Sequence, residues 1–248
     1  MGWLLLPALD LLSLVLAAGS LAHLARGAVR PGRFARDPRT RTDFGRTVYG
    51  AAWTSVIYCR PVLHAVLSCS PLRALCFRLF GYRGQLDFTT SPDTWLRDLP
   101  LLDLGAGAYL ANRATLDTNT VEPNGHIRVD GIRIGARTVV GHLALVSQGV
   151  VLGDDVVVGV NAALGRKARV GDGAHIGARS NVAIGTGVDV GRSARVAAGL
   201  RLAAGAHVPD RAQLRTQADA DRCALRALAE PRSSSRPSRL HGPLTCAG

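Results

Sequence analysis

Aliphatic residues recur at every sixth position along much of the second half of the chain, and a small residue, usually glycine, follows most of them. The aliphatic positions are Leu104, Leu110, Leu116, Ile134, Val140, Val146, Leu152, Val158, Leu164, Val170 and Ile176, then, after a two-residue slip, Ile184, Val190, Val196, Leu202 and Val208. An amphipathic helix repeats at about 3.6 residues and a strand at about two. A short period sustained over about a hundred residues therefore predicts a solenoid.

Three six-residue units make one triangular coil of about eighteen residues, with a short strand on each side. The aliphatic side chains point inward, and the small residue that follows lies at a corner, where a side chain would crowd the turn and positive φ is often needed. Coils stack at about 4.8 Å, each contacts only its neighbours, and the ends need caps. The pattern predicts an all-β solenoid of about six coils over residues 101–209.

The composition agrees with such a core, because hydrophobic residues make up 47% of the chain and aromatic residues only 5%. The net charge of +12 is compatible with nucleic acid, an anionic membrane or phosphate-bearing cofactors. No nucleic-acid recognition motif accompanies the charge, so we expect no nucleic-acid partner. The five cysteines have no zinc or disulfide spacing, which favours a reducing compartment and no metal.

An apolar run from Trp3 to Leu24 begins the chain, and a series of arginines follows it. Its length could span a bilayer, and the trailing positive charge favours an uncleaved anchor whose C-terminal side is cytoplasmic. Asp10 is the objection, since a carboxylate near the bilayer centre costs about 2.5–3.5 kcal/mol. A helix lying in the interface or packed on protein therefore stays open beside the spanning one. We expect residues 1–26 to associate the protein with the cytoplasmic face of a membrane.

The other segments outside the repeat have simpler patterns. Residues 27–46 read as a basic linker, and residues 47–100, broken by Pro61 and Pro71, as an amphipathic helical segment leading into the repeat. Residues 210–230 predict a helix that caps the last coil, and the Ser-, Pro- and Arg-rich residues 231–248 predict a disordered tail.

The repeat, in runs such as IGARTVVGHLALV, VLGDDVVVGV and VGDGAHIGARSNVAIG, resembles the hexapeptide-repeat superfamily of left-handed β-helices. The left hand is implied by the resemblance, because chirality rules alone would predict a right-handed crossover. Most members are acyltransferases using acyl-CoA or acyl carrier protein, and some are carbonic anhydrases or non-catalytic scaffolds. The preceding LRALCFRLFGYRG also resembles the leading segment of several such acyltransferases and of a terminal domain on some non-ribosomal peptide synthetases. The Thr-His-Thr element of that domain is matched here by Thr118-Asn119-Thr120.

One stretch breaks the repeat. Between Leu116 and Ile134, NTVEPNGHIRVDG places polar residues where aliphatic ones are due. The spacing equals one coil, and the polar composition predicts a loop pushed out of the wall, of the kind that often forms a binding face. A harmless irregularity is the alternative.

His142 follows this stretch as the second residue after the inward Val140. In that register the resemblance extends to UDP-N-acetylglucosamine acyltransferases, which carry Ile-Ala-His, and to the acetyltransferase half of bifunctional uridylyltransferases, which carries Gly-His-Leu. In both, the histidine is the general base. Acyl transfer needs a base that works near neutral pH, and histidine supplies one. An outward-facing turn histidine is the alternative, and His126 in the irregular loop is the second choice of base.

A base needs an orienting partner and an oxyanion donor. Counting by eighteen places Asn124 below His142 and Asn161 beside the residue above it, while Gly141 offers a backbone N–H. The candidates for orientation or substrate contact are Asn124, Glu122, Asn161 and Gln148. His175 and His207 read as solvated.

The resemblance implies three prisms packed as a homotrimer, with the cofactor in the groove between subunits and its phosphates against basic residues of later coils. Candidate contacts are Arg166, Lys167, Arg179, Arg195 and Arg201. The carbonic anhydrase branch needs two zinc-binding histidines five residues apart, and no two histidines here have that spacing. We therefore expect an acyltransferase that moves an acyl group, in the simplest case an acetyl group, from a CoA thioester to a hydroxyl or amine of a sugar, lipid or peptide-like acceptor. A non-catalytic scaffold is the alternative.

Overall fold

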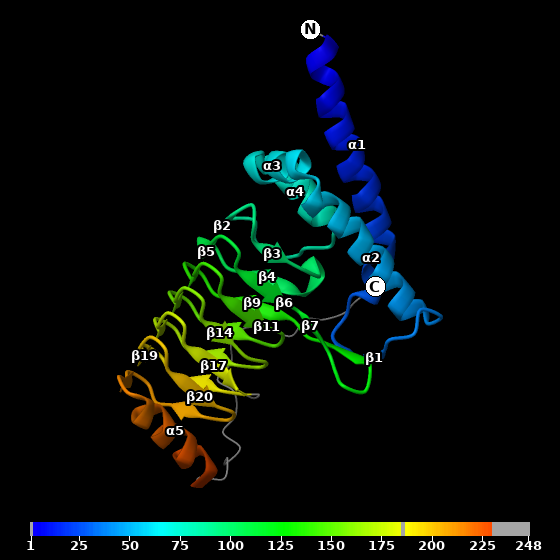
Figure 1. The fold of residues 1–248 in the computed structure, drawn as a ribbon. Coiled ribbons are helices and arrows are strands. Elements are labelled where there is room, and N and C mark those ends of the chain that lie inside the picture. The colour runs from blue at the N-terminus through cyan, green and yellow to red at the C-terminus, as the bar shows by residue number, and fades with distance from the viewer. Residues whose placement is uncertain (1, 185–186, 230–248) are drawn as a thin grey trace.

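The computed structural model describes residues 2–184 and 187–229 of the chain. Short parallel strands form a three-sided prism, with a helical segment at its N-terminal end and one helix across the other end (Figure 1). The all-β solenoid predicted from the period of six is confirmed, including its three-sided section and its number of coils.

Three parallel sheets make the walls of the prism. The first sheet contains β2 (Phe88–Thr90), β5 (Ala108–Leu110), β10 (Val139–Val140), β13 (Val157–Val158), β16 (His175–Ile176), β19 (Arg195–Val196) and β22 (Gln213–Leu214). The second contains β3 (Trp95–Leu96), β6 (Thr115–Asp117), β11 (Leu145–Ser147), β14 (Ala163–Leu164), β17 (Asn181–Ile184) and β20 (Arg201–Ala203). The third contains β4 (Leu102–Leu104), β9 (Ile132–Ile134), β12 (Val151–Leu152), β15 (Arg169–Val170), β18 (Asp189–Val190) and β21 (His207–Val208). The solenoid thus extends beyond residues 101–209 at both ends.

The aliphatic repeat fills the inside of the prism. Val140 pairs with Val158, and Val158 with Ile176, so one coil takes eighteen residues. All three side chains are at most 1% exposed. Each coil therefore buries one aliphatic residue per side against the coils above and below.

Crowding explains the glycine after each aliphatic residue. A Cβ at Gly141 would lie 2.7 Å from the carbonyl oxygen of Val158 in the next coil, closer than side-chain carbons come to backbone. Positive φ occurs two residues later, at non-glycine positions such as Leu143 (58°) and Asn161 (54°). The sequence suggests two reasons for small corner residues, crowding of the turn and positive φ. At Gly141 the reason is crowding, because the backbone of the next coil approaches closely.

The structure places both irregularities of the repeat, the two-residue slip and the polar stretch before Ile134, differently from what the sequence predicts. Val182 is fully buried in register with Leu164, and Val190 pairs with Val170, so the two-residue slip falls between Val182 and Val190. It does not fall before Ile184.

The second irregularity is an insertion of twelve residues. Val140 pairs with Leu110, thirty positions earlier, but with Val158 eighteen positions later. The extra residues form a hairpin of β7 (Asn119–Val121) and β8 (His126–Val129) outside the wall, and β8 also pairs with β1 (Gly32–Ala35). The predicted loop is confirmed, but it joins two consecutive sides of a coil and does not replace a whole coil.

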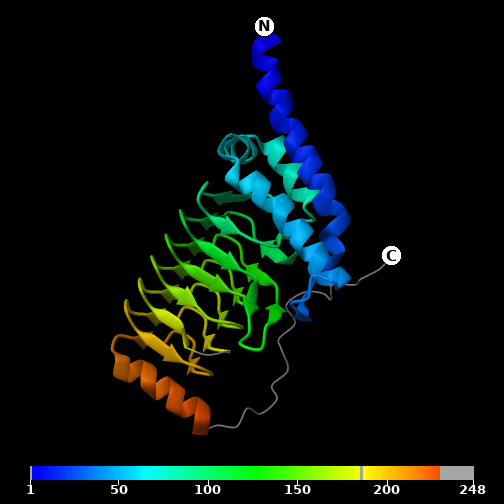
Figure 2. The ribbon, with the colours of Figure 1, turned by 45° about the vertical axis from the view of Figure 1, so that its right-hand side comes forward.

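The helical segment closes the N-terminal end of the prism. Figure 2 shows α1 (Gly2–Ala25) extending well past the other helices. The remaining elements are η1 (Arg26–Ala28), α2 (Arg41–Tyr58), α3 (Arg60–Ser68), α4 (Ser70–Leu79) and η2 (Leu99–Leu101). Edge-to-face ring contacts join Trp53 of α2 to Phe77 and Phe80, and the Trp53 indole N–H donates to the carbonyl of Leu96 at 2.6 Å. These aromatic side chains cover the first coil, as a solenoid end requires.

The other end is capped by α5 (Gln217–Ala229). The Gln217 side chain accepts from the N–H of Arg201 and donates to its carbonyl, which satisfies the backbone of the terminal strand β20. Thr216 and Asp219 fix the start of the helix, since the Asp219 carboxylate accepts from the N–H of Thr216 at 2.9 Å. The helix predicted over residues 210–230 is present but begins at Gln217, because Gln213–Leu214 form the last strand of the first sheet, and the predicted tail lies outside the described residues.

Candidate active site

The predicted site residues lie on two different edges of the prism. The His142 edge, between the first and second sheets, consists of residues 111–114, 141–144, 159–162 and 177–180, and it carries Gly141, His142, Asn161 and Arg179. The hairpin edge, between the second and third sheets, consists of residues 117–131, 147–150 and 165–168. It carries the other candidates, Glu122, Asn124, His126, Gln148, Arg166 and Lys167.

The insertion moves Asn124 away from His142. The N–H of Leu143 donates to the carbonyl of Asn112, so the coil below His142 presents Asn112 there. The prediction that Asn124 stacks under His142 is wrong, because counting by eighteen fails across twelve extra residues. Asn161, unlike Asn124, does lie beside His142, because its backbone N–H donates to the backbone carbonyl of His142 at 2.7 Å.

The His142 edge holds backbone N–H groups without acceptors. Gly141 is not one of them, since its N–H donates to Val158 in the ladder at 2.8 Å, which contradicts its predicted role as a free donor. Among the described residues, the N–H groups of His142 and Val160 donate no hydrogen bond, and the exposed imidazole of His142 makes none. At the equivalent corners between the third and first sheets, aspartates accept such groups, for example Asp154 from the N–H of Ala136.

Apolar side chains surround His142 on the surface. The exposed fractions are 51% for Leu143, 47% for Val160, 40% for Tyr109 and 39% for Leu145. An exposed apolar patch of this kind is typical of a surface that contacts another molecule.

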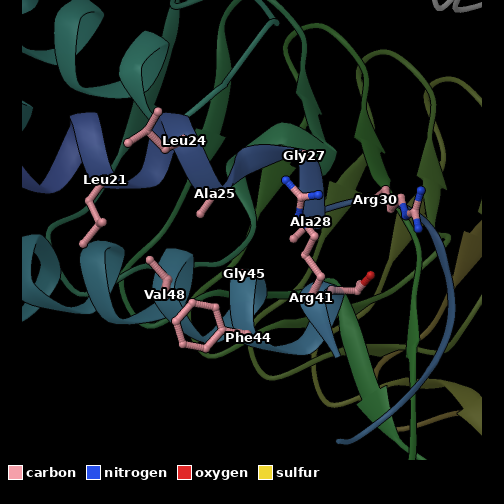
Figure 3. A pocket seen from close by; sticks show the side chains of 11 residues that line it. Leu21, Leu24, Ala25, Gly27, Ala28, Arg30, Arg41, Phe44, Gly45 and Val48 are labelled. Carbon is pink, nitrogen blue, oxygen red and sulfur yellow. The ribbon is translucent and has the colours of Figure 1, made fainter. Parts of the chain in front are cut away.

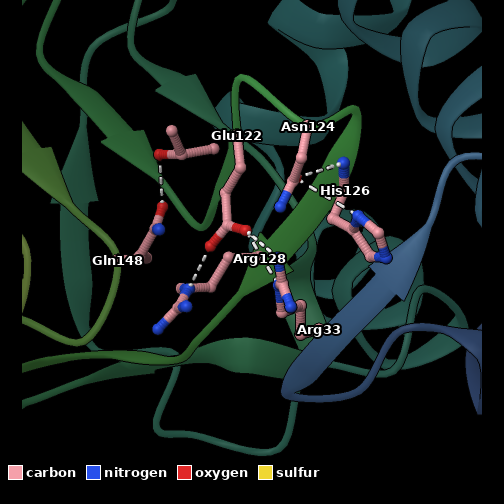
Figure 4. A network of polar contacts seen from close by, with 7 residues as sticks. Arg33, Glu122, Asn124, His126, Arg128 and Gln148 are labelled. Carbon is pink, nitrogen blue, oxygen red and sulfur yellow. Dashed lines mark hydrogen bonds and ion pairs between the residues drawn. The ribbon is translucent and has the colours of Figure 1, made fainter.

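Within the hairpin, the carboxylate of Glu122 is already paired (Figure 4). Both Glu122 oxygens accept hydrogen bonds at 2.8 Å, one from Arg33 of β1 and the other from Arg128 of β8. The bonds from Arg128 and then Arg33 lower the pKa of the Glu122 carboxyl, so it stays ionised. Glu122 thus ties the hairpin to the segment after α1, and its carboxylate is occupied.

His126 and Asn124 meet within the hairpin. The side-chain oxygen Oδ1 of Asn124 lies 3.1 Å from the backbone nitrogen of His126 and 3.2 Å from Nδ1 of the His126 ring (Figure 4). The Asn124 side chain therefore orients His126, the second choice of base, and not His142.

The sequence did not reveal a buried polar cluster at the base of the hairpin. The carboxylate of Asp98, 4% exposed, accepts from Arg46 of α2, from the Thr118 hydroxyl, both at 2.9 Å, and from Asn119 at 3.4 Å. Two members of the matched Thr118-Asn119-Thr120 element thus bind a carboxylate. The third, Thr120, donates to Gln148 at 2.7 Å.

Near this cluster, some buried nitrogen atoms lack a hydrogen-bond partner among the described residues, and one carboxyl group has a raised pKa. Arg46 Nη1 and Gln148 Nε2 are buried without a hydrogen-bond partner among the described residues. Burial also raises the pKa of the Asp117 carboxyl. Asp98 has a φ of 51°. The residues around it in the sequence do not indicate its role, because its partner Arg46 is 52 positions away.

The basic candidates divide between the edges as well. Arg179 is exposed and lies one coil above Asn161. The two residues have nearly the same φ, 57° for Arg179 and 54° for Asn161. Arg166 and Lys167 lie on the hairpin edge, where Arg166 Nε is buried without a partner among the described residues. Of the predicted cofactor contacts other than Gly141, Asn161 and Arg179 lie on the His142 edge, where they can contact a ligand. No group of three metal-ligating side chains occurs in the part of the chain that the structure describes.

Comparison with known families and structures agrees with the repeat. The family model for the hexapeptide repeat of succinyl-transferase matches residues 131–166 and 167–204. Residues 131–204 of the solenoid therefore carry the hexapeptide repeat. Comparison with curated proteins gives no match.

Similar solved structures are acetyltransferases. The acetyltransferase domain of PglB from Neisseria gonorrhoeae, in complex with acetyl coenzyme A, is 18% identical with a TM-score of 0.36; the match covers 58% of this chain and 60% of that one. A hexapeptide-repeat acetyltransferase from Vibrio cholerae is 15% identical with a TM-score of 0.33, over 66% of this chain and 92% of that one. PerB from Caulobacter crescentus, in complex with CoA and GDP-perosamine, is 20% identical with a TM-score of 0.23, over 58% and 57%. The chain thus spans about three fifths of the PglB domain, and at these low scores the family assignment rests on the repeats.

Proposed function

We propose that this hexapeptide-repeat protein is a membrane-associated acyltransferase that moves an acyl group, in the simplest case acetyl, from a CoA thioester to a hydroxyl or amine. The observation that carries the proposal is the His142 edge. There an exposed imidazole stands beside backbone N–H groups of His142 and Val160 that have no acceptor among the described residues. Unpaired donors and a base at one place are the two parts that acyl transfer requires.

In this reaction the acceptor oxygen or nitrogen attacks the thioester carbonyl carbon while His142 takes its proton. The N–H of Val160 or His142 stabilises the carbonyl oxygen as it becomes negative. The carbon–sulfur bond then breaks, and the histidinium returns its proton to the leaving thiolate. Asn161, beside His142, positions the acceptor or donor, and Arg179 in the next coil offers charge to the donor's phosphates.

The assembly that we propose is a homotrimer with the site between subunits. Leu143, Val160, Tyr109 and Leu145 leave an apolar surface around His142 in a single chain. A second copy packed on this edge would bury that surface and close a groove over the histidine, which excludes water from the thioester. The acceptor is then a sugar, a lipid or a peptide-like molecule that enters the groove from its open end.

Membrane association is proposed through α1. The segment Leu9–Ala28 is long and apolar enough to cross a bilayer, by length and composition, and the bent pair of α3 and α4 passes the same test only when the two helices are taken together. Asp10 is exposed on α1, so both a spanning helix and one lying in the interface remain compatible with the fold. In either case the arginines that follow favour the cytoplasmic side for the solenoid.

A non-catalytic scaffold is the second candidate, and two observations favour it. The His142 side chain has no orienting hydrogen bond among the described residues. Asn119 also stands where the resembling Thr-His-Thr element has its histidine, and it binds Asp98. A scaffold would keep the repeat and bind partners without turning over a thioester.

Release of free CoA tests the proposal. The full chain in detergent is incubated with acetyl-CoA and longer acyl-CoAs, with and without pools of sugar, amine and lipid acceptors, and thiol release is followed. We expect acceptor-dependent release, and a loss of about 10²–10⁴-fold for His142→Ala. His126→Ala should lose less, and His175→Ala, on an exposed part of β16, should keep its rate.

Circular dichroism of each variant checks that the β-helix is intact. Full activity of His142→Ala together with loss in His126→Ala would move the base to the hairpin. Activity retained in all three variants would exclude a histidine base. No acceptor-dependent release from any thioester would favour the scaffold.

A further inference from the structure

A groove between α1 and α2 lies far from the candidate active site. It has a volume of about 520 Å³, and its walls are the last turns of α1 and the first turns of α2. Leu21 of α1 and Val48 of α2 point toward each other across it (Figure 3). Leu24 is 85% exposed and Phe44 61% exposed, so the groove is an apolar surface that nothing in the described chain covers.

Positive charge stands at one end of this groove. Arg30 and Arg41 line it together beyond the apolar side chains (Figure 3). Neither forms an ion pair with any described residue, and the one contact of the Arg30 guanidinium is with the Phe34 ring at 5.8 Å. The nearest acidic residues along the chain are Asp37, which accepts from the N–H of Arg39, and Asp43, which is buried, and among the described residues neither forms an ion pair with these arginines.

The groove thus complements an amphipathic anion, a molecule with hydrocarbon along one length and negative charge at one end, because its wall is apolar and two arginines stand at one end. A second copy of this chain would bring its own arginines against Arg30 and Arg41, so like charges would oppose that contact. An anion with a hydrocarbon tail neutralises the arginines and covers the leucines at once.

From this geometry we infer that the groove binds an anionic phospholipid of the membrane. One acyl chain lies along Leu21, Leu24, Phe44 and Val48, and the phosphate contacts Arg30 and Arg41. The inference rests on the proposed membrane association. It adds the class of lipid, and it sets the end of α1 at the level of the headgroups whether α1 spans the bilayer or lies along it.

Lipid retention by the full chain tests the inference. The protein in detergent micelles is titrated with phosphatidylglycerol or phosphatidylcholine of identical acyl chains, and bound lipid is counted by native mass spectrometry. We expect one phosphatidylglycerol to be retained in preference to phosphatidylcholine. Inorganic phosphate at equal concentration should not displace it, since phosphate alone gains nothing from the apolar wall.

Variants separate the charge from the apolar wall. Arg30→Gln with Arg41→Gln should weaken phosphatidylglycerol binding about 30-fold, because each basic residue near an anionic surface contributes about 1 kcal/mol. Arg169→Gln with Arg211→Gln removes the same charge from exposed solenoid positions and should leave binding unchanged. Phe44→Ser should weaken both lipids about fivefold. All these side chains are exposed, so the fold should survive.

Three results would overturn the inference: equal retention of both lipids, equal loss in the two arginine pairs, or displacement by phosphate alone. A change in oligomeric mass on Phe44→Ser without a change in lipid would assign the groove to a second copy. The CoA-release assay is run on the same variants with a soluble acceptor. Lipid binding without thioester turnover would leave this site standing while the proposed activity fails, and the reverse result would separate them in the other direction.

Discussion

The His142 edge and the hairpin edge are built on the same repeat, yet their polar groups are in opposite states. On the His142 edge, the imidazole and several backbone N–H groups, those of His142 and Val160 among them, have no partner among the described residues. On the hairpin edge, Glu122 has two arginines and Asp98 has three donors. Paired and buried groups hold a structure together, whereas exposed unpaired groups are available to a ligand. Function is therefore expected at the edge that looks simpler in sequence.

The cause of the difference is the insertion. In the strict coils between Val140 and Ile176, adjacent coils pair residue by residue, and at the His142 edge the described residues include no side chain that accepts from the N–H groups of His142 and Val160. At the hairpin, twelve additional residues leave the wall, β1 pairs with β8, and Asn119 binds Asp98, which also binds Arg46 of α2. The resulting network connects the segment after α1 to the first coils.

The largest expected effect is on the buried pair of the hairpin edge. Asp98→Asn keeps the shape and the hydrogen-bond acceptor but leaves the Arg46 guanidinium, 8% exposed, without its counter-charge. Removing one partner of a buried ion pair typically costs about 3–5 kcal/mol. Urea unfolding should show that loss, whereas Asp93→Asn, in the exposed pair with Arg60, should cost less than about 1 kcal/mol. Equal losses would mean that Asp98 is not the centre of the network.

A smaller effect is expected at the apolar surface around His142. Val160→Asp places a carboxylate where a second copy is proposed to pack, and an unpaired charge there should weaken association about 100-fold. Light scattering in detergent over a range of concentrations would follow the conversion from trimer to monomer. His207→Asp, at an exposed position on β21, is the control and should stay trimeric. A wild-type chain that is monomeric at every concentration would contradict the trimer itself.

The smallest effect is expected from removing the insertion. Deleting residues 119–130 brings Leu116 and Ile134 six positions apart, as the repeat requires, so the solenoid should still fold. The strand β1 would lose its partner β8, and trypsin should cleave at Arg33 and Arg36 about tenfold faster. Glu122→Gln keeps the hairpin and should change cleavage little. Loss of β-sheet circular dichroism in the deletion would show that the hairpin is needed for folding.

Most of the wall could be read from the sequence. Inward positions such as Val158 and Ile176 were predicted because burial imposes an aliphatic side chain on each side of each coil. The glycine at position 141 followed from the same local geometry. The C-terminal cap and an outward loop were also predictable, since polar composition and a broken period mark where the repeat ends, whereas the pairing of the loop into a hairpin was not predicted.

The contacts between distant polar residues could not be predicted from the sequence. Asn124 was assigned to His142 by counting eighteen, but the backbone pairs Val140 with Leu110 across thirty residues. Arg46 and Asp98 are separated by 52 positions, and nothing local in either segment marks the other. A hydrophobic period reports whether each side chain is buried, because burial acts on one residue at a time. The partner of a polar group depends on how many residues the chain places between two coils, and only the folded backbone, by closing its hydrogen bonds around an insertion, decides that number.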